Sequence, residues 1–209
     1  MLIFNRFFIF LIFSLVLTGC MLSVDNVRPT HIHYLDKTDP KWQIHLAQIK
    51  QIKSYHIQGQ IGYLDRKQRA SVTFDWQYHS PNEYTLTLSS ILSRSLFILE
   101  KKNGEFIITD EKGKSHNNSN AQHLLEETLG IMIPIDQLAI WLKGDPNAQL
   151  DYQVGENHLL ASFTYSIYSD EWTVDYLNYH NSPIPLPQDI LLKNTDQTLK
   201  IRVNNWKYQ

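Results

Sequence analysis

The strictest pattern in this 209-residue chain is an alternation of apolar and polar side chains between residues 69 and 80. A period of two is the mark of a β-strand with one face buried and the other facing water. The apolar members are Ala70, Val72, Phe74, Trp76 and Tyr78. After a turn at residues 80–82, the same alternation continues with Tyr84, Leu86 and Leu88. Strands of this kind are stable only within a sheet that covers a hydrophobic interior.

Weaker patterns of the same type extend the sheet on both sides. Residues 56–63 alternate before a turn at 65–68, and Asn103-Gly104 predicts a hairpin between strands at 96–100 and 105–110. Residues 112–118 are expected to form a polar loop. Further short strands are predicted at 152–154, 159–168, 172–179, 190–193 and 199–206. The total is about nine to eleven antiparallel strands, and a sheet of that size has to curl or close.

Helices are predicted before the sheet and as an insertion within it. Asp39 followed by Pro40 is typical of an N-cap and a first helical position. The apolar positions that follow recur every three or four residues: Trp42, Leu46, Ile49 and Ile52. We expect an amphipathic helix there, with one stripe against the sheet.

Two more helices interrupt the strands. Ser119 and Gln122 have the spacing of a capping box before residues 123–129. Pro134 opens a second helix over 135–142, which carries Leu138 and Trp141 on its apolar side. The chain is therefore predicted to be α+β, with a strongly curved or barrel-like sheet. Its inward face encloses either a packed core or an apolar cavity.

The N-terminus has the form of a bacterial lipoprotein signal. An apolar run over residues 7–17 follows Arg6 and is too short to span a hydrocarbon core of about 30 Å. It ends in Leu17-Thr18-Gly19-Cys20, a lipobox, and Cys20 is the only cysteine of the chain. We expect residues 1–19 to be cleaved, Cys20 to carry the lipid anchor, residues 20–38 to form a tether and residues 39–209 to form one domain.

Composition narrows the range of partners and cofactors. A net charge of −2 gives no reason to expect nucleic-acid binding. Acylation of Cys20 leaves no free thiol, so neither disulfides nor cysteine-ligated metals are expected. Aromatic residues make up 12% of the chain, including 5 Trp and 11 Tyr, and some of them could line a cavity.

Motifs of catalysis are not found in the sequence. It contains no His-Glu-x-x-His, no Gly-x-Ser-x-Gly, no phosphate loop and no dinucleotide fingerprint, while His31 and His33 lie in the predicted tether. We therefore predict no enzyme activity, no metal and no cofactor beyond the covalent lipid. Spacing alone leaves open a carboxylate pair assembled from distant strands.

The connection after residue 88 is unusual because Ile91 and Leu92 stand among serines, where turn chemistry favours polar residues. Spacing supports two interpretations equally. The two side chains are either exposed at a loop tip, where apolar residues usually contact a partner, or fold back into the core or a continued strand.

Several of these residues together resemble the LolB family of outer-membrane lipoprotein receptors. The similarity covers most of the chain after Cys20. It rests on the lipobox, Trp42, residues 57–61, the Phe74-Asp75-Trp76 strand, residues 128–130 and 133–135, Leu138, Trp141, Leu142, Gly144, residues 172–176, Tyr179, Pro187 and Trp206.

The resemblance implies a half-open antiparallel barrel capped by helices, with an apolar cavity for acyl chains. Its implied partners are the periplasmic carrier LolA, cargo lipoproteins and outer-membrane lipid, and the implied state is a monomer. Met21 after the lipidated cysteine implies the outer membrane. Leu92 matches the family's membrane-inserting leucine, and this favours an exposed loop. The family usually has Pro-Leu-Gly where this chain has Ile91-Leu92-Ser93, so Ile91 could share that role.

The cavity residues expected on this basis are Val72, Phe74, Trp76, Tyr84, Leu86, Leu88, Leu138 and Trp141. Two other classes of protein remain possible from the sequence. A scaffolding envelope lipoprotein would have a filled core with its inward aromatic side chains in mutual contact. A surface hydrolase would have two converging carboxylates in a polar cleft.

Overall fold

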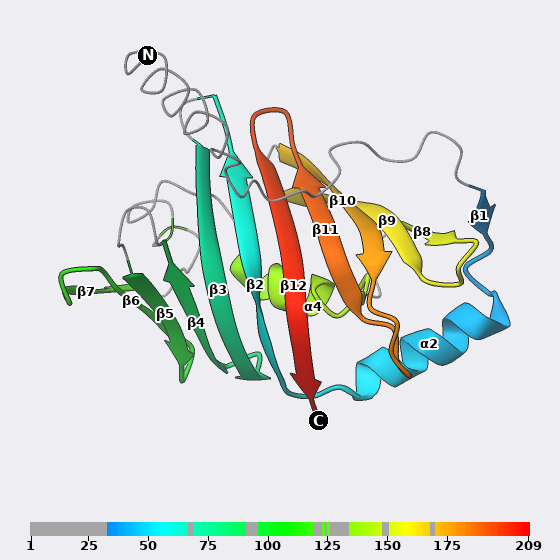
Figure 1. Ribbon diagram of the computed structural model, residues 1–209, viewed down its shortest axis with the longest axis horizontal. Coiled ribbons are helices and arrows are strands. Elements are labelled where there is room, and N and C mark those ends of the chain that lie inside the picture. Colours follow the sequence, from blue (N-terminus) through cyan, green and yellow to red (C-terminus); the bar gives the residue numbers. More distant parts are fainter. Residues whose placement is uncertain are drawn as a thin grey trace, which may run out of the picture.

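The computed structural model describes residues 33–66, 69–90, 96–118, 123, 125, 134–147, 151–167 and 170–209. In these residues the chain forms one sheet of 12 strands with two helices, α2 and α4 (Figure 1). The elements are β1 (Tyr34–Leu35), α2 (Pro40–Gln51), β2 (Tyr55–Leu64), β3 (Arg69–Ser80), β4 (Glu83–Ser89), β5 (Leu96–Lys102), β6 (Glu105–Thr109), β7 (Ser115–Asn118), α4 (Ile135–Trp141), β8 (Tyr152–Gly155), β9 (Leu160–Ile167), β10 (Asp170–Tyr179), β11 (Pro187–Lys193) and β12 (Thr198–Tyr208). The α+β prediction is confirmed.

The sheet consists of two meanders joined through β12 and β2. Its strand order is β1-β8-β9-β10-β11-β12-β2-β3-β4-β5-β6-β7, with every pairing antiparallel. Within the described residues β1 and β7 remain the two free edges, so the sheet is open and fits the expected half-open form. Helix α4 lies behind β2 and β12 in Figure 1, on one face of the sheet.

The sequence predicted about nine to eleven strands, and the structure has 12. The difference has a physical reason. Residues 115–118 were expected in a polar loop, but they pair with β6 as β7. Tyr34 and Leu35, in the predicted tether, pair with Val154 and Gly155 of β8. Backbone hydrogen bonds hold an edge strand without an apolar face, so alternation does not reveal it.

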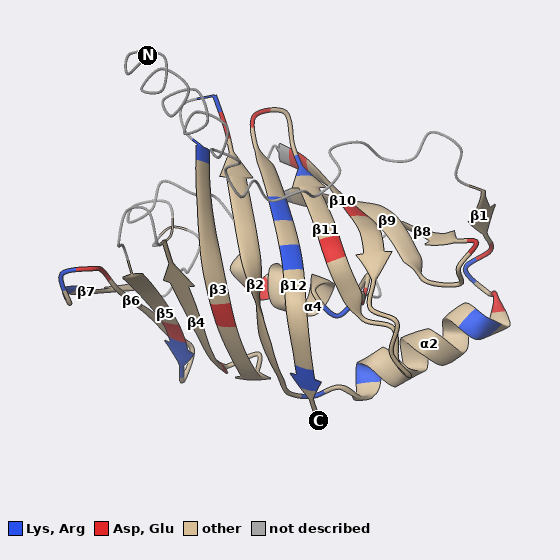
Figure 2. Ribbon diagram, in the orientation of Figure 1, with Lys and Arg blue, Asp and Glu red and all other residues tan. Residues whose placement is uncertain are grey.

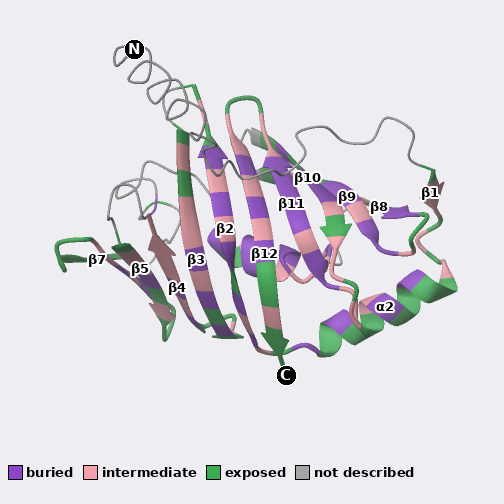
Figure 3. Ribbon diagram, in the orientation of Figure 1, coloured by how far each residue is buried: buried purple, intermediate pink, exposed green. Residues whose placement is uncertain are grey.

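Burial alternates along the strands as the sequence pattern predicts, and Figure 3 shows this as bands on β2, β3 and β12. One inward row runs directly across six strands, with each residue opposite the next: Trp206, Ile57, Trp76, Leu86, Leu99 and Ile108. Such rows bury apolar surface continuously from one meander into the other, which stabilises the long β12–β2 pairing.

Helix α2 begins as predicted. The Asp39 carboxylate accepts a hydrogen bond from the Trp42 backbone N–H at 2.9 Å, and Pro40 occupies the first helical turn. The buried residues of this helix are Trp42, His45 and Ile49, and Leu46 is partly buried and packs against the same core as predicted. His45 is an inward residue that the periodicity did not predict. Ile52 follows the helix as its C-cap.

Candidate functional site: the inner face of the sheet and helix α4

The inner face of β3 and β4 presents most of the predicted acyl-chain residues together. Phe74, Trp76, Tyr84 and Leu86 are all at most 4% exposed, and the register places Trp76 opposite Leu86 and Phe74 opposite Leu88. Two further members, Val72 and Leu88, are partly buried and pack against this core. The strand geometry therefore gathers these six predicted side chains on one surface.

Helix α4 contributes the other two predicted residues. Leu138 and Trp141 are 1% and 0% exposed. The Trp141 ring packs edge-on against Phe163 and Tyr165 of β9, with ring centroids 5.2 and 5.0 Å away. The eight predicted residues are thus divided between β3–β4 and a helix that contacts the other meander.

Tyrosine hydroxyls from the sheet bind the backbone of α4. Tyr55 donates to the Ala139 carbonyl oxygen at 2.8 Å, and Tyr176 donates to that of Trp141 at 2.7 Å. Burial raises the pKa of both phenols well above the ordinary value, so both remain protonated donors. A short helix leaves its last carbonyls without intrahelical partners. The Tyr55 hydroxyl supplies a bond to Ala139, and the Tyr176 hydroxyl adds a second donor to the Trp141 carbonyl oxygen, which also accepts from the Gly144 N–H at 2.8 Å.

The N-terminal turn of α4 is held by charge. The Asp136 carboxylate accepts hydrogen bonds from Lys101 and from the Tyr84 hydroxyl, both at 3.0 Å. Lys101 also lies over the Phe106 ring, 4.7 Å from its centroid. Burial, with the charge and hydrogen bond of Asp136, raises the pKa of Tyr84. The helix is therefore bound to the sheet at both ends.

Sequence analysis missed these contacts with α4, although it named Tyr84 as a cavity residue. Tyr55, Tyr84, Lys101 and Tyr176 come from four strands, and their partners lie 35 to 84 residues away along the chain. Local patterns contain no signal for such pairs. Only the fact that a short helix needs outside partners for its terminal carbonyls could have indicated that donors were required.

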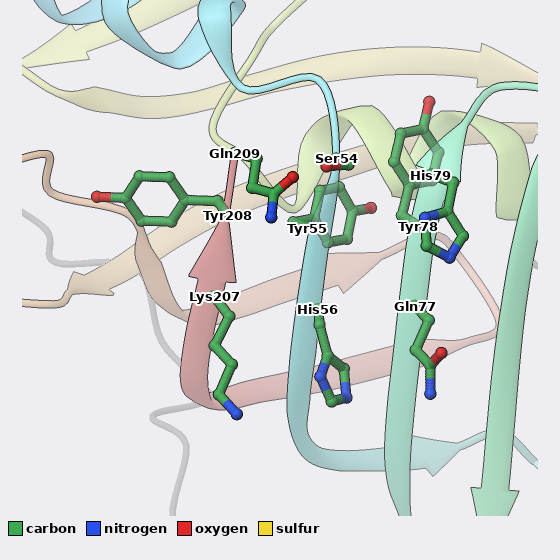
Figure 4. Close-up of a pocket in the computed structure, with 9 residues that line it drawn as sticks. All are labelled: Ser54, Tyr55, His56, Gln77, Tyr78, His79, Lys207, Tyr208 and Gln209. Carbon is green, nitrogen blue, oxygen red and sulfur yellow. The ribbon is translucent and has the colours of Figure 1, made fainter.

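A pocket of about 250 Å³ lies elsewhere, at the ends of β12, β2 and β3 (Figure 4). Its lining includes His56, His79 and Lys207 beside the stacked rings of Tyr55 and Tyr78, whose centroids are 4.8 Å apart. His56 also lies 2.9 Å from the Asp75 carboxylate on the neighbouring strand. None of the eight predicted acyl-chain residues, all of them in the described part of the chain, lines this pocket.

The remaining predicted site residues cannot be placed in the fold. Cys20, Ile91 and Leu92 lie outside the described residues, as does the predicted capping box. Ser89 and Leu96, which flank the predicted insertion loop, pair across β4 and β5. The described ranges contain no cluster of three metal-binding side chains and no helix with the length and apolarity of a membrane span.

The fold, an open antiparallel sheet with a helix on one face, is similar to solved structures of other proteins. It is similar to the LolA superfamily protein NE2245 from Nitrosomonas europaea, with a TM-score of 0.54, 11% identity, and coverage of 80% of this chain and 93% of that one. It is also similar to a putative outer membrane lipoprotein-sorting protein domain from Vibrio parahaemolyticus, with a TM-score of 0.54, 7% identity and coverage of 81% and 91%. The chain therefore shares the class of fold seen in these two proteins.

Comparison of the sequence with known proteins identifies the family to which the chain belongs. Residues 53–206 match the family model described as outer membrane lipoprotein LolB. The chain is 48% identical to the outer-membrane lipoprotein LolB of Pasteurella multocida (strain Pm70), over 98% of each chain, and 45% identical to that of Haemophilus influenzae (strain ATCC 51907 / DSM 11121 / KW20 / Rd), over 97% of each. The chain belongs to the LolB family and is an outer-membrane lipoprotein of the lipoprotein transport system.

Proposed function

We propose that this chain accepts lipoproteins from a periplasmic carrier of the LolA type and binds their acyl chains against the inner face of its sheet. The observation that carries the proposal is the surface formed by β3, β4 and α4. It joins Phe74, Trp76, Leu86, Leu138 and Trp141 in one hydrophobic core. A surface of several large apolar and aromatic side chains suits a ligand that consists mainly of hydrocarbon chains.

Transfer of this kind needs no chemical step. Each methylene exposed to water costs about 0.8 kcal/mol, so a free acylated protein in the periplasm is strongly unfavourable. Passage from a carrier's apolar surface to this one, and then to a bilayer, keeps the methylenes out of water throughout. Small differences in binding free energy then set the direction, and no nucleotide, metal or other cofactor is required.

Two further parts of the proposal concern the membrane. Cys20 carries diacylglycerol and an amide-linked chain, which together hold the protein firmly where one chain would bind only marginally. Leu92, assisted by Ile91, enters or perturbs the outer-membrane surface when cargo is released. The protein acts as a monomer that faces the periplasm, and its partners are the carrier, the cargo and outer-membrane lipid.

The test is transfer of a radiolabelled lipoprotein from purified carrier to the chain of residues 21–209. All described helices and strands lie between residues 34 and 208, so this chain keeps the whole described fold without the anchor. After mixing, each protein is pulled down separately and counted. Label that moves to this chain supports the proposal, whereas label that stays on the carrier contradicts it.

A scaffolding lipoprotein with a filled core is the second candidate, because inward aromatic rings contact one another. The Tyr84 ring lies 5.8 Å from Trp76 and 6.2 Å from Tyr78, measured between centroids. A scaffold would not acquire label in the transfer experiment.

The hydrolase alternative has less support in the described residues, because the most buried carboxylate has a structural partner and an exposed carboxylate on α4 has a lysine beside it. Asp189, 2% exposed, accepts two hydrogen bonds from Arg202 at 2.7 and 3.1 Å. Figure 2 shows an acidic band on β11 beside basic bands on the neighbouring strand β12. Asp136, described above, likewise has Lys101 as its partner.

A further inference from the structure

Two indole N–H groups are buried without a hydrogen-bond acceptor. They are Nε1 of Trp76 on β3 and Nε1 of Trp141 at the end of α4, and no acceptor reaches either in the described structure. The two side chains are 1% and 0% exposed, so bulk water cannot supply one. A buried donor left unpaired costs free energy that folded proteins avoid at nearly every position.

Two other tryptophans of this chain do satisfy their donors. Trp42 Nε1 donates to the Tyr152 hydroxyl at 3.3 Å, and Trp206 Nε1 donates to the Pro187 carbonyl at 3.0 Å. Both of these lie outside the predicted acyl-chain set. The two buried indoles without an acceptor are the two tryptophans that belong to that set, and the fifth tryptophan, Trp172, is not among the buried unpaired donors.

The surroundings of both donors are apolar. Trp76 lies directly between Ile57 of β2 and Leu86 of β4 in the inward row, and Trp141 packs against Phe163 and Tyr165. A hydrogen bond formed in such a water-poor setting is stronger than one formed at the surface, and a missing one is correspondingly more costly. A ligand that brings an acceptor to these positions would gain more than hydrocarbon contact alone provides.

We propose that Trp76 and Trp141 donate hydrogen bonds to the carbonyl oxygens of the bound acyl groups, the ester or amide oxygens through which each chain is attached to the cargo's modified cysteine. This inference rests on the proposed function and specifies its ligand. Methylenes offer no acceptor, whereas each acyl group carries one carbonyl oxygen beside its chain. The site thus recognises acyl groups, not hydrocarbon as such.

Both rings are covered in the unliganded chain. An entering acyl group must therefore move inner-face side chains apart and replace their contacts with its own. The hydrogen bonds it forms with the two indoles help to offset that rearrangement.

The binding test uses three synthetic lipopeptides and residues 21–209. One lipopeptide carries two palmitoyl esters on its glycerylcysteine, the second carries the matching hexadecyl ethers, which lack carbonyls, and the third carries only an N-palmitoyl amide. We expect the diester to bind more tightly than the diether. Trp76→Phe and Trp141→Phe should each weaken binding of a carbonyl-bearing ligand by about fivefold and leave diether binding nearly unchanged. The ester and amide ligands show which carbonyl each indole contacts.

Trp42→Phe and Trp206→Phe are the matched controls, because these substitutions remove donors that are already paired within the protein. They should reduce the stability of the fold, but they should not change the ratio of the diester and diether affinities. If Trp76→Phe and Trp141→Phe also weaken diester and diether binding equally, or leave both unchanged, the proposed hydrogen bonds to the carbonyl oxygens are contradicted. The proposal that the chain binds acyl groups would still hold. If none of the three lipopeptides binds, the proposed function itself fails.

A second measurement, by NMR, uses the native sequence without substitutions. Indole ¹H–¹⁵N spectra of the ¹⁵N-labelled chain report each Nε1–H, and a new hydrogen bond moves its proton signal downfield. We expect the Trp76 and Trp141 signals to move downfield with the diester and not with the diether. Equal movement with both ligands, or movement with neither while both bind, overturns the inference.

Discussion

The phenolic hydroxyl of Tyr176, on β10, donates a hydrogen bond to the backbone carbonyl oxygen of Trp141 across 2.7 Å. This contact ties the end of α4 to the meander opposite the one that carries Trp76. Tyr55 makes the equivalent contact with Ala139 from β2. The position of the helix over the inner face therefore depends on two hydroxyls from opposite halves of the sheet.

Tyr176→Phe should destabilise the chain by about 1 kcal/mol, because the Trp141 carbonyl oxygen loses one of its two donors and keeps the Gly144 N–H, at 2.8 Å, while the ring volume is kept. Urea unfolding of residues 21–209 measures the change. Tyr208→Phe is the control, since Tyr208 is 37% exposed and should change stability little. Equal effects of the two substitutions would show that the hydroxyl of Tyr176 contributes nothing.

Acid should destabilise the fold through His45. Burial lowers its pKa from 6.5 to about 4, so between these values the unfolded chain binds a proton that the folded chain excludes. The free energy of unfolding should therefore fall as pH drops from 6.5 towards 4, by about 3 kcal/mol from this residue. The fall should level off below the folded pKa.

The matching variant is His45→Phe, which keeps an aromatic ring at this site beside Trp42, whose ring centroid is 6.0 Å away. Urea midpoints at intervals between pH 7 and 4 should give a flatter profile for the variant than for the native chain. If the two profiles are parallel, the acid sensitivity comes from groups other than His45.

Gly59→Ala should be strongly destabilising, by about 3 kcal/mol or more. A methyl group at Gly59 would lie 1.9 Å from the Arg202 carbonyl oxygen and 2.7 Å from Phe74 Cε1, so backbone and ring would both have to shift. The clash falls where β12 and β2 change register beside Val203. Thermal unfolding checks the prediction, which a loss below 1 kcal/mol would contradict.

Leu92→Glu should leave acceptance of cargo intact and reduce its insertion into liposomes by about tenfold or more, since a carboxylate is costly to place in lipid. The measurement is the fraction of radiolabelled cargo that becomes membrane-bound after transfer. Ile44→Glu is the control, because Ile44 is 61% exposed on α2, outside the predicted insertion loop. If the Leu92 variant inserts cargo into liposomes as well as the native chain does, the proposed role of Leu92 is contradicted.

Local physics determined much of this fold from the sequence alone. Alternation identified the inward face of β3, because side chains of a strand point to opposite sides in turn. Asp39 and Pro40 marked the start of α2, because capping involves residues three positions apart. The single cysteine and the residues shared with LolB indicated the family, which the relatives confirm.

The tertiary structure decided what depends on partners distant in sequence. It made a strand of polar residues 115–118 by placing them along the edge of β6, and it buried His45 on α2 together with Trp42 and Ile49. It also supplied the donors for α4 and left those of Trp76 and Trp141 unpaired. Periodicity reports which side a residue faces, but hydrogen bonding depends on which atoms meet there, and only the folded chain brings those atoms together.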